Sequence, residues 1–336
     1  MNWLAFDIGG AHLKVADGCG FSLEQPFALW RQPAELHQGI ARMLALAPPC
    51  DAVAVTMTGE LADCYPARAE GVRQILQEVE QGSGDRLLRV YRTAGDFVSI
   101  TDAVREPHAV AASNWHAMAR WAGRQFSRGS AVLIDIGSTT TDLIPLSEGQ
   151  VHAAGKTDLA RLQSGELVYT GVRRTPIATL ISELPYQGTL CGVARETFAT
   201  TLDVYLTLDQ WPEDTGDCAT ADSRPATKAA ARRRLARMLC LDQDDLTRED
   251  CRAMAAAVME SQLNLLEKAL ARVLKRQAAT NAYAILSGCG EFLARQLVHR
   301  MAPNMHVESL RAADNLNNSQ CAPAHAVAVL ARELCR

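Results

Sequence analysis

Val132-Leu-Ile-Asp-Ile-Gly-Ser-Thr-Thr-Thr-Asp142 joins a run of apolar residues to a turn made of glycine and hydroxyl side chains. The pattern predicts a buried strand over 131–135, a polar turn and a second strand from about residue 141. The tip of such a hairpin presents backbone N–H groups and hydroxyls to an anion. The carboxylate of Asp135 cannot bind that anion directly, so a bridging cation is predicted, most simply Mg²⁺. The alternative is an ordinary tight hairpin with a polar tip.

The first residues of the chain repeat this device. Trp3-Leu-Ala-Phe-Asp-Ile-Gly-Gly-Ala-His-Leu-Lys-Val-Ala-Asp17 is again an apolar strand followed by Asp-Ile-Gly, small residues and a second strand. The two hairpins are far apart in the chain, so they indicate an internal repeat on the scale of a domain. Because Asp7 and Asp135 end corresponding strands, we expect their carboxylates to face each other and to bind one divalent cation.

A third glycine turn lies near the C-terminus, in Ile285-Leu-Ser-Gly-Cys-Gly-Glu-Phe-Leu-Ala294. It reads as a strand-to-helix turn, which lets a ligand approach the backbone near the N-terminus of a helix. The three motifs, in this order, resemble the phosphate-1, phosphate-2 and adenosine motifs of the actin/hexokinase/Hsp70 superfamily. The resemblance implies an α/β fold of two ribonuclease-H-like domains separated by a central cleft.

The superfamily resemblance also implies a set of phosphate-binding residues. A basic residue at the position of Lys14 meets a transferred or leaving phosphate in that superfamily. His12 could do the same, although a lone histidine is often simply packed or hydrogen-bonded. The predicted phosphate-binding residues are Gly9, Gly10, His12, Lys14, Gly137, Ser138, Thr139, Thr140, Gly288 and Gly290.

Further segments narrow the resemblance to the hydantoinase/oxoprolinase-like proteins. Within these, the chain is similar to a subgroup linked to tetrahydromethanopterin one-carbon metabolism. That subgroup includes a methanofuran-biosynthesis synthase that joins γ-glutamyltyramine to an aminomethylfuran diphosphate. The segments that carry this resemblance are Val55-Thr-Met-Thr-Gly-Glu-Leu-Ala-Asp63, Ala112-Ser-Asn-Trp115, Ser164-Gly-Glu-Leu-Val-Tyr-Thr-Gly-Val-Arg-Arg-Thr-Pro176 and Thr220-Ala-Asp222.

The order of predicted elements divides the chain into two domains. At 336 residues the chain is longer than one core usually holds. Residues 1–107 read as βββαβαβ, the order of a ribonuclease-H-like domain, and 108–336 repeat the scheme. A helix over 108–124, interrupted by Asn114 and Trp115, is predicted to cross between the domains. Residues 157–240 break the repeat as a substrate-specificity insertion. Individual expectations include strands at 97–100 and 152–154 and helices at 195–206 and 228–239.

Two carboxylates follow the predicted strand 52–57. Glu60 and Asp63 come after the turn Thr58-Gly59, where a side chain leaving the strand end can serve as a general base or a second metal contact. The alternative is that one of them caps the next helix. With Lys14 and Asp7 they form the predicted catalytic set. Asn114 either hydrogen-bonds a substrate or fixes the helix between the domains.

The insertion carries candidate substrate-binding residues. Arg173 and Arg174 are adjacent and point in different directions, so at most one is expected to bind a given ligand. A guanidinium binds two oxygens of a diphosphate or carboxylate at once, and Tyr169 could stack on an aromatic substrate. The arginine-rich helix over 228–239 is either a solvated face or a binding surface for a carboxylate-rich substrate such as a glutamyl chain.

Composition limits the classes of partner. The net charge of −4 gives no general attraction to nucleic acid, and no apolar run is long enough to span a bilayer. The N-terminus has no basic region of the kind that begins a secretory signal. Ten scattered cysteines without a C-x-x-C pair are typical of a reducing cytoplasm. We therefore expect a cytoplasmic protein that binds small molecules with diphosphate and glutamyl groups; a homodimer is compatible with the sequence.

Three functions remain open at this point. The resemblance implies an Mg²⁺-dependent transferase of methanofuran biosynthesis, which condenses the furan diphosphate with γ-glutamyltyramine and releases diphosphate. The three nucleotide motifs also fit an enzyme that binds ATP, either a small-molecule kinase or an oxoprolinase/hydantoinase-like amide hydrolase. The third alternative is a non-catalytic sensor or scaffold, against which the intact Asp7, Asp135 and phosphate turns argue.

Overall fold

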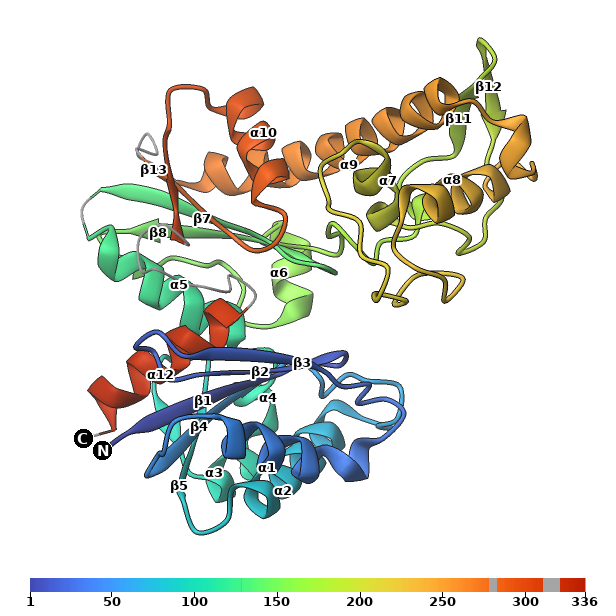
Figure 1. The fold of residues 1–336 in the computed structure, drawn as a ribbon. Coiled ribbons are helices and arrows are strands. Elements are labelled where there is room, and N and C mark those ends of the chain that lie inside the picture. The colour runs from blue at the N-terminus through green and yellow to red at the C-terminus, as the bar shows by residue number, and fades with distance from the viewer. Residues whose placement is uncertain (128, 278–282, 311–320, 336) are drawn as a thin grey trace.

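A computed structural model describes residues 1–127, 129–277, 283–310 and 321–335. The chain forms two α/β domains, each built on a mixed sheet, and a mainly helical lobe extends from the second domain (Figure 1). The fold predicted from the sequence, two ribonuclease-H-like domains of the actin/hexokinase type, is confirmed.

The first sheet has the order β3-β2-β1-β4-β5-β6. The first three strands form an antiparallel meander, and β4 and β5 then continue parallel to β1. Every residue of β1 and β4 is buried, which is typical of central strands with both faces covered. The elements are β1 (Trp3–Ile8), β2 (His12–Ala16), β3 (Ser22–Pro26), η1 (Pro33–Glu35), α1 (Leu36–Leu46), β4 (Ala52–Met57), α2 (Arg68–Ser83), β5 (Leu87–Tyr91), β6 (Phe97–Val98), α3 (Ile100–Arg105) and α4 (Pro107–Val110).

The second sheet repeats the central part of this arrangement in the order β10-β8-β7-β13-β14, with β9 paired to β8. Its β7–β8 hairpin is the counterpart of β1–β2, and β13 runs parallel to β7 as β4 does to β1. The elements are β7 (Ser130–Ile136), β8 (Thr141–Ser147), β9 (Gln150–Val151), α6 (Asp158–Ser164), β10 (Leu167–Val168), β13 (Tyr283–Ser287), α10 (Glu291–Met301) and β14 (His306–Ser309).

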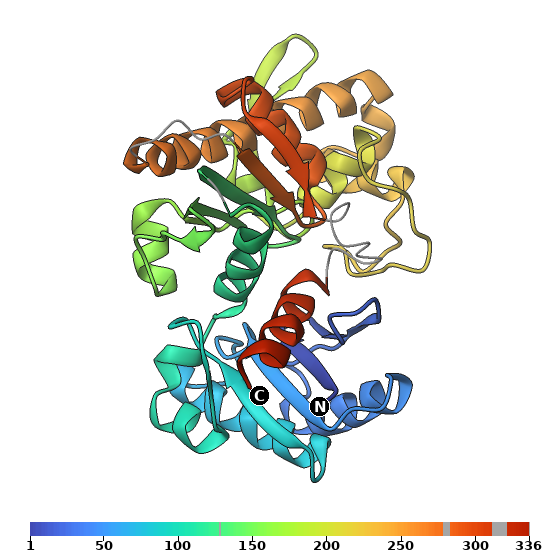
Figure 2. The same ribbon diagram turned by 90° about the vertical axis from the view of Figure 1, so that its left-hand side faces the viewer.

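Two helices join the domains. α5 (Asn114–Gln125) packs against β8 and β9 of the second domain, and α12 (Ala322–Leu334) packs against α5 and against β1, β2 and β4 of the first. Figure 2 shows α12 beside the first sheet. One apolar cluster consequently runs from Trp3 through Trp115 to Ile144. The division at residue 107 therefore follows the order of the chain, whereas in space the last helix completes the first domain.

The helix predicted over 108–124 is interrupted, as expected, but the interruption lies at residues 111–113 rather than at Asn114 and Trp115. The chain leaves α4 and turns at Ala112, whose φ is +46°, before α5 begins. The buried hydroxyl of Ser113 anchors the break, because it donates to the carbonyl of Tyr91 at 3.0 Å and lies 2.9 Å from the hydroxyl of Thr56. These contacts are made by residues distant in the chain, so helical periodicity alone could not reveal them.

Several strands and helices begin or end at residues other than those predicted, in two cases because a helix cap forms there. The strand expected over 97–100 stops at Val98, because Ser99 accepts a hydrogen bond from the N–H of Asp102 and caps α3. The helix expected over 195–206 begins only at Thr201, after a capping box between Thr200 and Asp203. The strand expected at 152–154 lies instead at β9.

The lobe that extends from the second domain contains most of the predicted insertion, whose first part instead forms α6 and β10 of the second domain. Its core holds a buried ion pair, in which Arg234 contacts Asp203 at 2.7 Å and Asp222 at 2.8 Å. The 228–239 helix is therefore neither wholly a solvated face nor wholly a binding surface, since its central arginine is only 1% exposed. The elements are η2 (Ile177–Thr179), β11 (Glu183–Tyr186), β12 (Thr189–Gly192), α7 (Thr201–Thr207), α8 (Lys228–Arg237), η3 (Gln243–Asp245) and the 29-residue α9 (Arg248–Arg276), which runs from the lobe onto the second sheet.

Removing one side of this buried ion pair should destabilise the protein. Arg234→Ala leaves the carboxylate of Asp203 buried without its guanidinium, which costs roughly 3–5 kcal/mol of unfolding free energy. Urea denaturation followed by tryptophan fluorescence measures the effect. Lys228→Ala on the same helix removes an exposed ion pair with Asp209 and should change the midpoint little. Equal midpoints for the two variants would contradict this account.

Candidate active site between the domains

The two glycine hairpins close in the same way. The N–H of Gly9 donates to the carbonyl of His12 at 3.0 Å, and the N–H of Gly137 donates to that of Thr140 at 2.9 Å. Each bond links the glycine to the third residue after it, so both tips have the same backbone closure. The internal repeat predicted from the sequence is therefore present at the level of single hydrogen bonds.

The second hairpin is in backbone contact with two other segments. A Cβ on Gly171 would lie 2.5 Å from three backbone atoms between Gly137 and Thr139. A Cβ on Gly288, whose φ is +86°, would lie 2.3 Å from the carbonyl oxygen of Ile136. Gly290 lies equally close and donates its N–H to that oxygen at 2.8 Å. The third glycine turn thus packs directly on the second hairpin.

Space for a ligand differs among the predicted phosphate-binding glycines. A Cβ on Gly10 would meet no atom within 4 Å, whereas one on Gly9 would lie 3.1 Å from the carbonyl oxygen of His12. The hydroxyls of Ser138 and Thr139 are 3.4 Å apart at the other tip. The tip residues of both hairpins (9–12 and 137–140) are half-buried, so they remain accessible.

Asp7 is the buried carboxylate at the end of β1. Its side chain is 2% exposed, and Oδ2 lies 3.4 Å from Nζ of Lys14 on the neighbouring strand. The other oxygen, Oδ1, is buried and has no hydrogen-bond partner among the described residues. Burial lowers the pKa of Lys14, but the carboxylates of Asp7 and Glu24 outweigh it, so the pKa of this ammonium is raised. Lys14 therefore stays charged.

Asp135 is the corresponding carboxylate of the second domain. Burial, together with the carboxylate of Asp142 opposite it in the hairpin register, raises the pKa of Asp135 to about 7. A hydrogen bond from Ser287 and the positive charge of Lys14 act in the opposite direction, and Asp7 adds repulsion. Lys14 and Asp7 therefore lie near enough to Asp135 to affect its pKa, so the two strand ends face the same region. That they share one metal site stays a prediction.

Glu60 lies in the turn after β4 and is 1% exposed. Burial raises the pKa of its carboxyl to about 7, the nearby guanidinium of Arg68 lowers it, and Asp158 and Asp7 raise it further. One carboxylate oxygen lies 3.7 Å from Nε of Arg68, and the other has no hydrogen-bond partner among the described residues. The structure thus brings Glu60 near Asp7, and we call Asp7, Asp135 and Glu60 the acid cluster.

Asp63, by contrast, is exposed in the same turn, away from this burial. The alternative that Glu60 or Asp63 caps α2 is wrong, because the residue before that helix is Ala67 and no side chain caps it. Of the two acidic candidates, Glu60 has the environment expected of an acid or base.

The segment after β10 brings two arginines toward the first domain. Burial lowers the pKa of His12, Glu24 raises it, and Lys14, Arg173 and Arg174 lower it further. Charges from both domains therefore meet at this histidine. Arg173 is already engaged, since it pairs with Asp217 and its Cζ lies 5.5 Å from the ring of Trp211, whereas the side chain of Arg174 is exposed.

Two predicted substrate-binding residues have no described contact with the acid cluster. Asn114 is the half-buried first residue of α5, and Tyr169 is 70% exposed beside β10. Within the described parts of the chain, no hydrogen bond or ion pair joins either side chain to Asp7, Asp135 or Glu60. Their roles stay predictions.

Sequence reasoning missed a line of buried and half-buried charges behind Glu60. Arg68 of α2 donates to Asp158 of α6 at 2.7 Å, across the two domains. One turn further along α6, the buried Arg161 pairs with Asp142 and lies over the ring of Trp115 at 4.1 Å. No local pattern marks these residues, because each pair joins segments distant in the chain.

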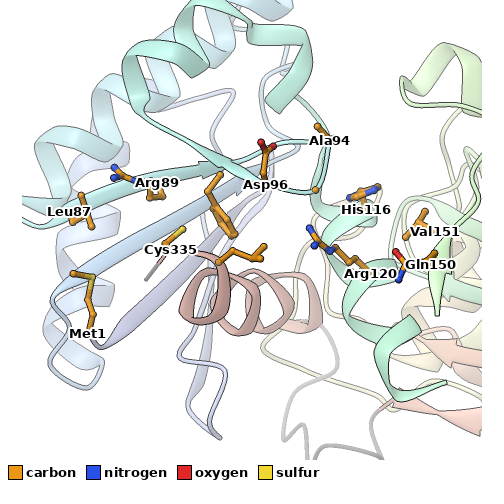
Figure 3. Close-up of a pocket in the computed structure, with 13 residues that line it drawn as sticks. Met1, Leu87, Arg89, Ala94, Asp96, His116, Arg120, Gln150, Val151 and Cys335 are labelled. Atoms are coloured by element: carbon orange, nitrogen blue, oxygen red, sulfur yellow. The ribbon is translucent and has the colours of Figure 1, made fainter. Parts of the chain in front are cut away.

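The larger of the two cavities described lies elsewhere. Its volume is about 850 Å³, and its walls come from β5, β6, α5, β9 and the end of α12 (Figure 3). His116 and Arg120 line it, but none of the predicted site residues does. The acid cluster is the better candidate for the active site, because it holds the unpartnered carboxylate oxygens of Asp7 and Glu60 and lies beside the predicted phosphate-binding turns.

The donor set restricts which metal the acid cluster could hold. Among the described residues, no group of three or more His, Cys, Asp or Glu side chains is arranged to hold a metal ion. Mg²⁺ needs fewer protein ligands, since it is commonly bound by one or two carboxylates with waters and substrate phosphates. Asp7, with its unpartnered oxygen, and Asp135 fit that requirement.

Two glycine hairpins with strand-end carboxylates, set on duplicated ribonuclease-H-like domains, define a protein of the actin/hexokinase class. The sequence profile of the hydantoinase/oxoprolinase family matches residues 51–334. The chain belongs to the hydantoinase/oxoprolinase family, which confirms the resemblance stated from the sequence.

Two relatives carry the same name, (4-{4-[2-(gamma-L-glutamylamino)ethyl]phenoxymethyl}furan-2-yl)methanamine synthase. The protein from Methanocaldococcus jannaschii is 31% identical over 330 residues, which covers 97% of this chain and 96% of the relative. The protein from Methanococcus vannielii is 29% identical over 203 residues, covering 60% of this chain and 90% of the relative.

A solved structure supports the fold alone. The structure described as the PilM-PilN type IV pilus biogenesis complex aligns with a TM-score of 0.53 at 12% identity, covering 98% of this chain and 97% of that one. Among the described residues, no helix is both long and apolar enough to cross a membrane.

The close contact at Gly171 predicts a sharp response to one methyl group. Gly171→Ala forces the second hairpin or the segment after β10 to move, which costs roughly 1–3 kcal/mol and lowers the melting temperature. Thermal unfolding monitored by circular dichroism tests this. The matched control is Gly192→Ala in β12, where the added Cβ meets no atom within 4 Å. Loss of stability in both variants alike would contradict the packing argument.

The buried carboxyl of Glu60 predicts a stability change with a definite sign. Because its pKa rises from 4.5 to about 7 on folding, the folded protein retains a proton that the unfolded chain has released between these values. Stability therefore falls as pH rises through this window. Glu60→Gln removes that loss, so its melting temperature relative to wild type should increase from pH 5 to pH 8. The melting temperature of the exposed control Glu183→Gln should follow that of wild type at every pH. A difference in melting temperature between Glu60→Gln and wild type that does not change with pH would refute this prediction.

Proposed function

We propose that this chain is a transferase of methanofuran biosynthesis that condenses an aminomethylfuran-methyl diphosphate with γ-glutamyltyramine and releases diphosphate. The observation that carries the proposal is the 31% identity to a synthase of that name over nearly the full length of both chains. The intact acid cluster and phosphate turns support a catalytic protein rather than a scaffold. A cytoplasmic location, a link to tetrahydromethanopterin metabolism and a homodimer are further parts of the proposal.

The leaving group suits the hairpin tips. Diphosphate carries negative charge that increases as its bond to the furfuryl carbon breaks, and the electron pair of that bond moves to the diphosphate oxygen. Backbone N–H groups and hydroxyls at 9–12 and 137–140 can donate to these oxygens, and the ammonium of Lys14 adds a fixed positive charge. Positive charge that develops on the exocyclic carbon is delocalised into the electron-rich furan ring.

Mg²⁺ fits this site through Asp7 and Asp135. When bound, the ion would neutralise diphosphate charge and assist its departure. The chain's own contribution is to hold two carboxylates at the ends of β1 and β7. One of these carries an unpartnered buried oxygen, and the other has a pKa of about 7, so a cation would favour its ionised form.

Glu60 suits the second half of the reaction. The phenol oxygen of γ-glutamyltyramine forms the new ether bond to the furfuryl carbon, and its proton must leave. A buried carboxylate with a pKa of about 7 and a free oxygen can accept that proton near neutral pH. The segment 169–174 would hold the glutamyl end, where the exposed Arg174 is free to pair with a carboxylate and Tyr169 to cover the aromatic ring.

Diphosphate release from the two substrates in the presence of Mg²⁺ tests the proposal. We expect diphosphate and the ether product in equal amounts and no response to ATP. Lys14→Gln should lower kcat by roughly 10²–10³, because it removes a donor aimed at the departing charge, while Lys268→Gln on the exposed part of α9 should leave kcat unchanged. Stabilisation or turnover by ATP, without diphosphate release from the furan substrate, would instead indicate a kinase or amide hydrolase.

A further inference from the structure

A line of alternating charges runs from the first domain into the second. It begins at Glu60 and passes through Arg68 to Asp158, then through Arg161 to Asp142. The step from Arg68 to Asp158 is a 2.7 Å hydrogen bond between residues 90 positions apart, on helices of different domains. The turn that carries the proposed base is thereby connected to β8 of the phosphate hairpin.

The backbone of Glu60 has little freedom of its own. A Cβ on Gly71 would lie 2.3 Å from the carbonyl oxygen of Glu60, so α2 presses directly on this turn. The direction of the carboxylate therefore depends on its charged neighbour, and the neighbour at 3.7 Å is Arg68. Because Glu60 is 1% exposed, solvent cannot replace that interaction.

Arg68 is in turn held from the other domain. Its side chain is only 21% exposed, and its shortest polar contact is with Oδ2 of Asp158 at the start of α6. Thr157 caps that helix by accepting from the N–H of Ala160, and Arg161 approaches Asp158 to 3.9 Å from within α6. The position of Arg68, and with it that of Glu60, thus depends on how closely the domains approach each other.

We propose that Arg68 and Asp158 are positioning residues that couple the approach of the two domains to the placement of the Glu60 carboxylate. This inference deepens the proposed function and rests on the role assigned there to Glu60. When the domains separate, Asp158 withdraws from Arg68, and the guanidinium then turns fully to Glu60. When they close, Asp158 shares the guanidinium, which leaves Glu60 more basic and oriented for the phenol.

Arg68 and Asp158 act on the proton affinity of Glu60 in opposite directions, so substitutions at the two positions should have different effects. Arg68 contributes a positive charge, while Asp158 and Asp7 contribute negative ones. Removing Arg68 should make Glu60 hold its proton to higher pH, and removing the charge of Asp158 should make it release the proton at lower pH. A purely structural salt bridge would lower stability in both variants without moving the pH profile in opposite directions.

The experiment compares Arg68→Gln, Asp158→Asn and wild type in the diphosphate-release assay between pH 5 and pH 9. We expect the acidic limb of kcat/KM to move up by roughly one pH unit in Arg68→Gln and down in Asp158→Asn. Arg300→Gln, which breaks an exposed ion pair with Glu260 on the second domain, should leave the profile unchanged. Profiles of both variants that coincide with wild type, or that move in the same direction, would overturn the proposal.

A second measurement separates this inference from the proposed reaction. Thermal unfolding against pH, compared with and without Glu60→Gln in each background, reports the proton affinity of Glu60 without any substrate. Opposite displacements in this measurement support the coupling even if no diphosphate is released, in which case the proposed function alone fails. If neither variant displaces the pH dependence of thermal unfolding, the coupling is overturned whatever the enzyme assay shows.

Discussion

Direct contact between backbones holds the second hairpin of this protein in place. Gly171 and Gly288 approach the segment 136–139 so closely that neither position has room for a Cβ. Three segments far apart in the chain thereby converge on one strand end, and Asp135 lies half-buried among them. Backbone hydrogen bonds from Val172 to Gly137 and from Arg173 and Arg174 to Ser138 join the arginine segment to the same hairpin tip. Everything proposed for the site depends on this convergence.

The same burial sets the chemistry of the acids. Asp7 and Glu60 lie where water screens them little, and Asp135 is half-buried, so each is strongly influenced by the few charges nearby. Lys14 partly balances the first two from within the first domain, whereas Glu60 relies on Arg68. A site with more buried carboxylate than buried cation is suited to accept a cation or a proton, and both are needed when diphosphate leaves and a phenol is captured.

Much of this architecture was predictable from the sequence, since repeated glycine hairpins have both a fixed spacing and a chemical reason. Asp7, Asp135 and the hairpin tips could be located for that reason, and Glu60 followed from its place after a buried strand. The position of the helix break at Ala112 and the series of ion pairs from Arg68 to Asp142 could not be predicted, because they depend on contacts between distant segments. The buried Arg234 escaped prediction similarly, as composition alone makes an arginine-rich helix look solvated.

The place of α12 has a consequence for how the protein is made. This helix covers β1 and β4, which are among the earliest parts of the chain to leave the ribosome, yet it begins 265 residues after the end of β4. Until then one face of the first sheet lacks its native cover and exposes apolar strands. The first domain therefore cannot complete its folding ahead of the second, as sequential domains commonly do, and the nascent chain must keep its N-terminal half from aggregating until synthesis reaches the last helix.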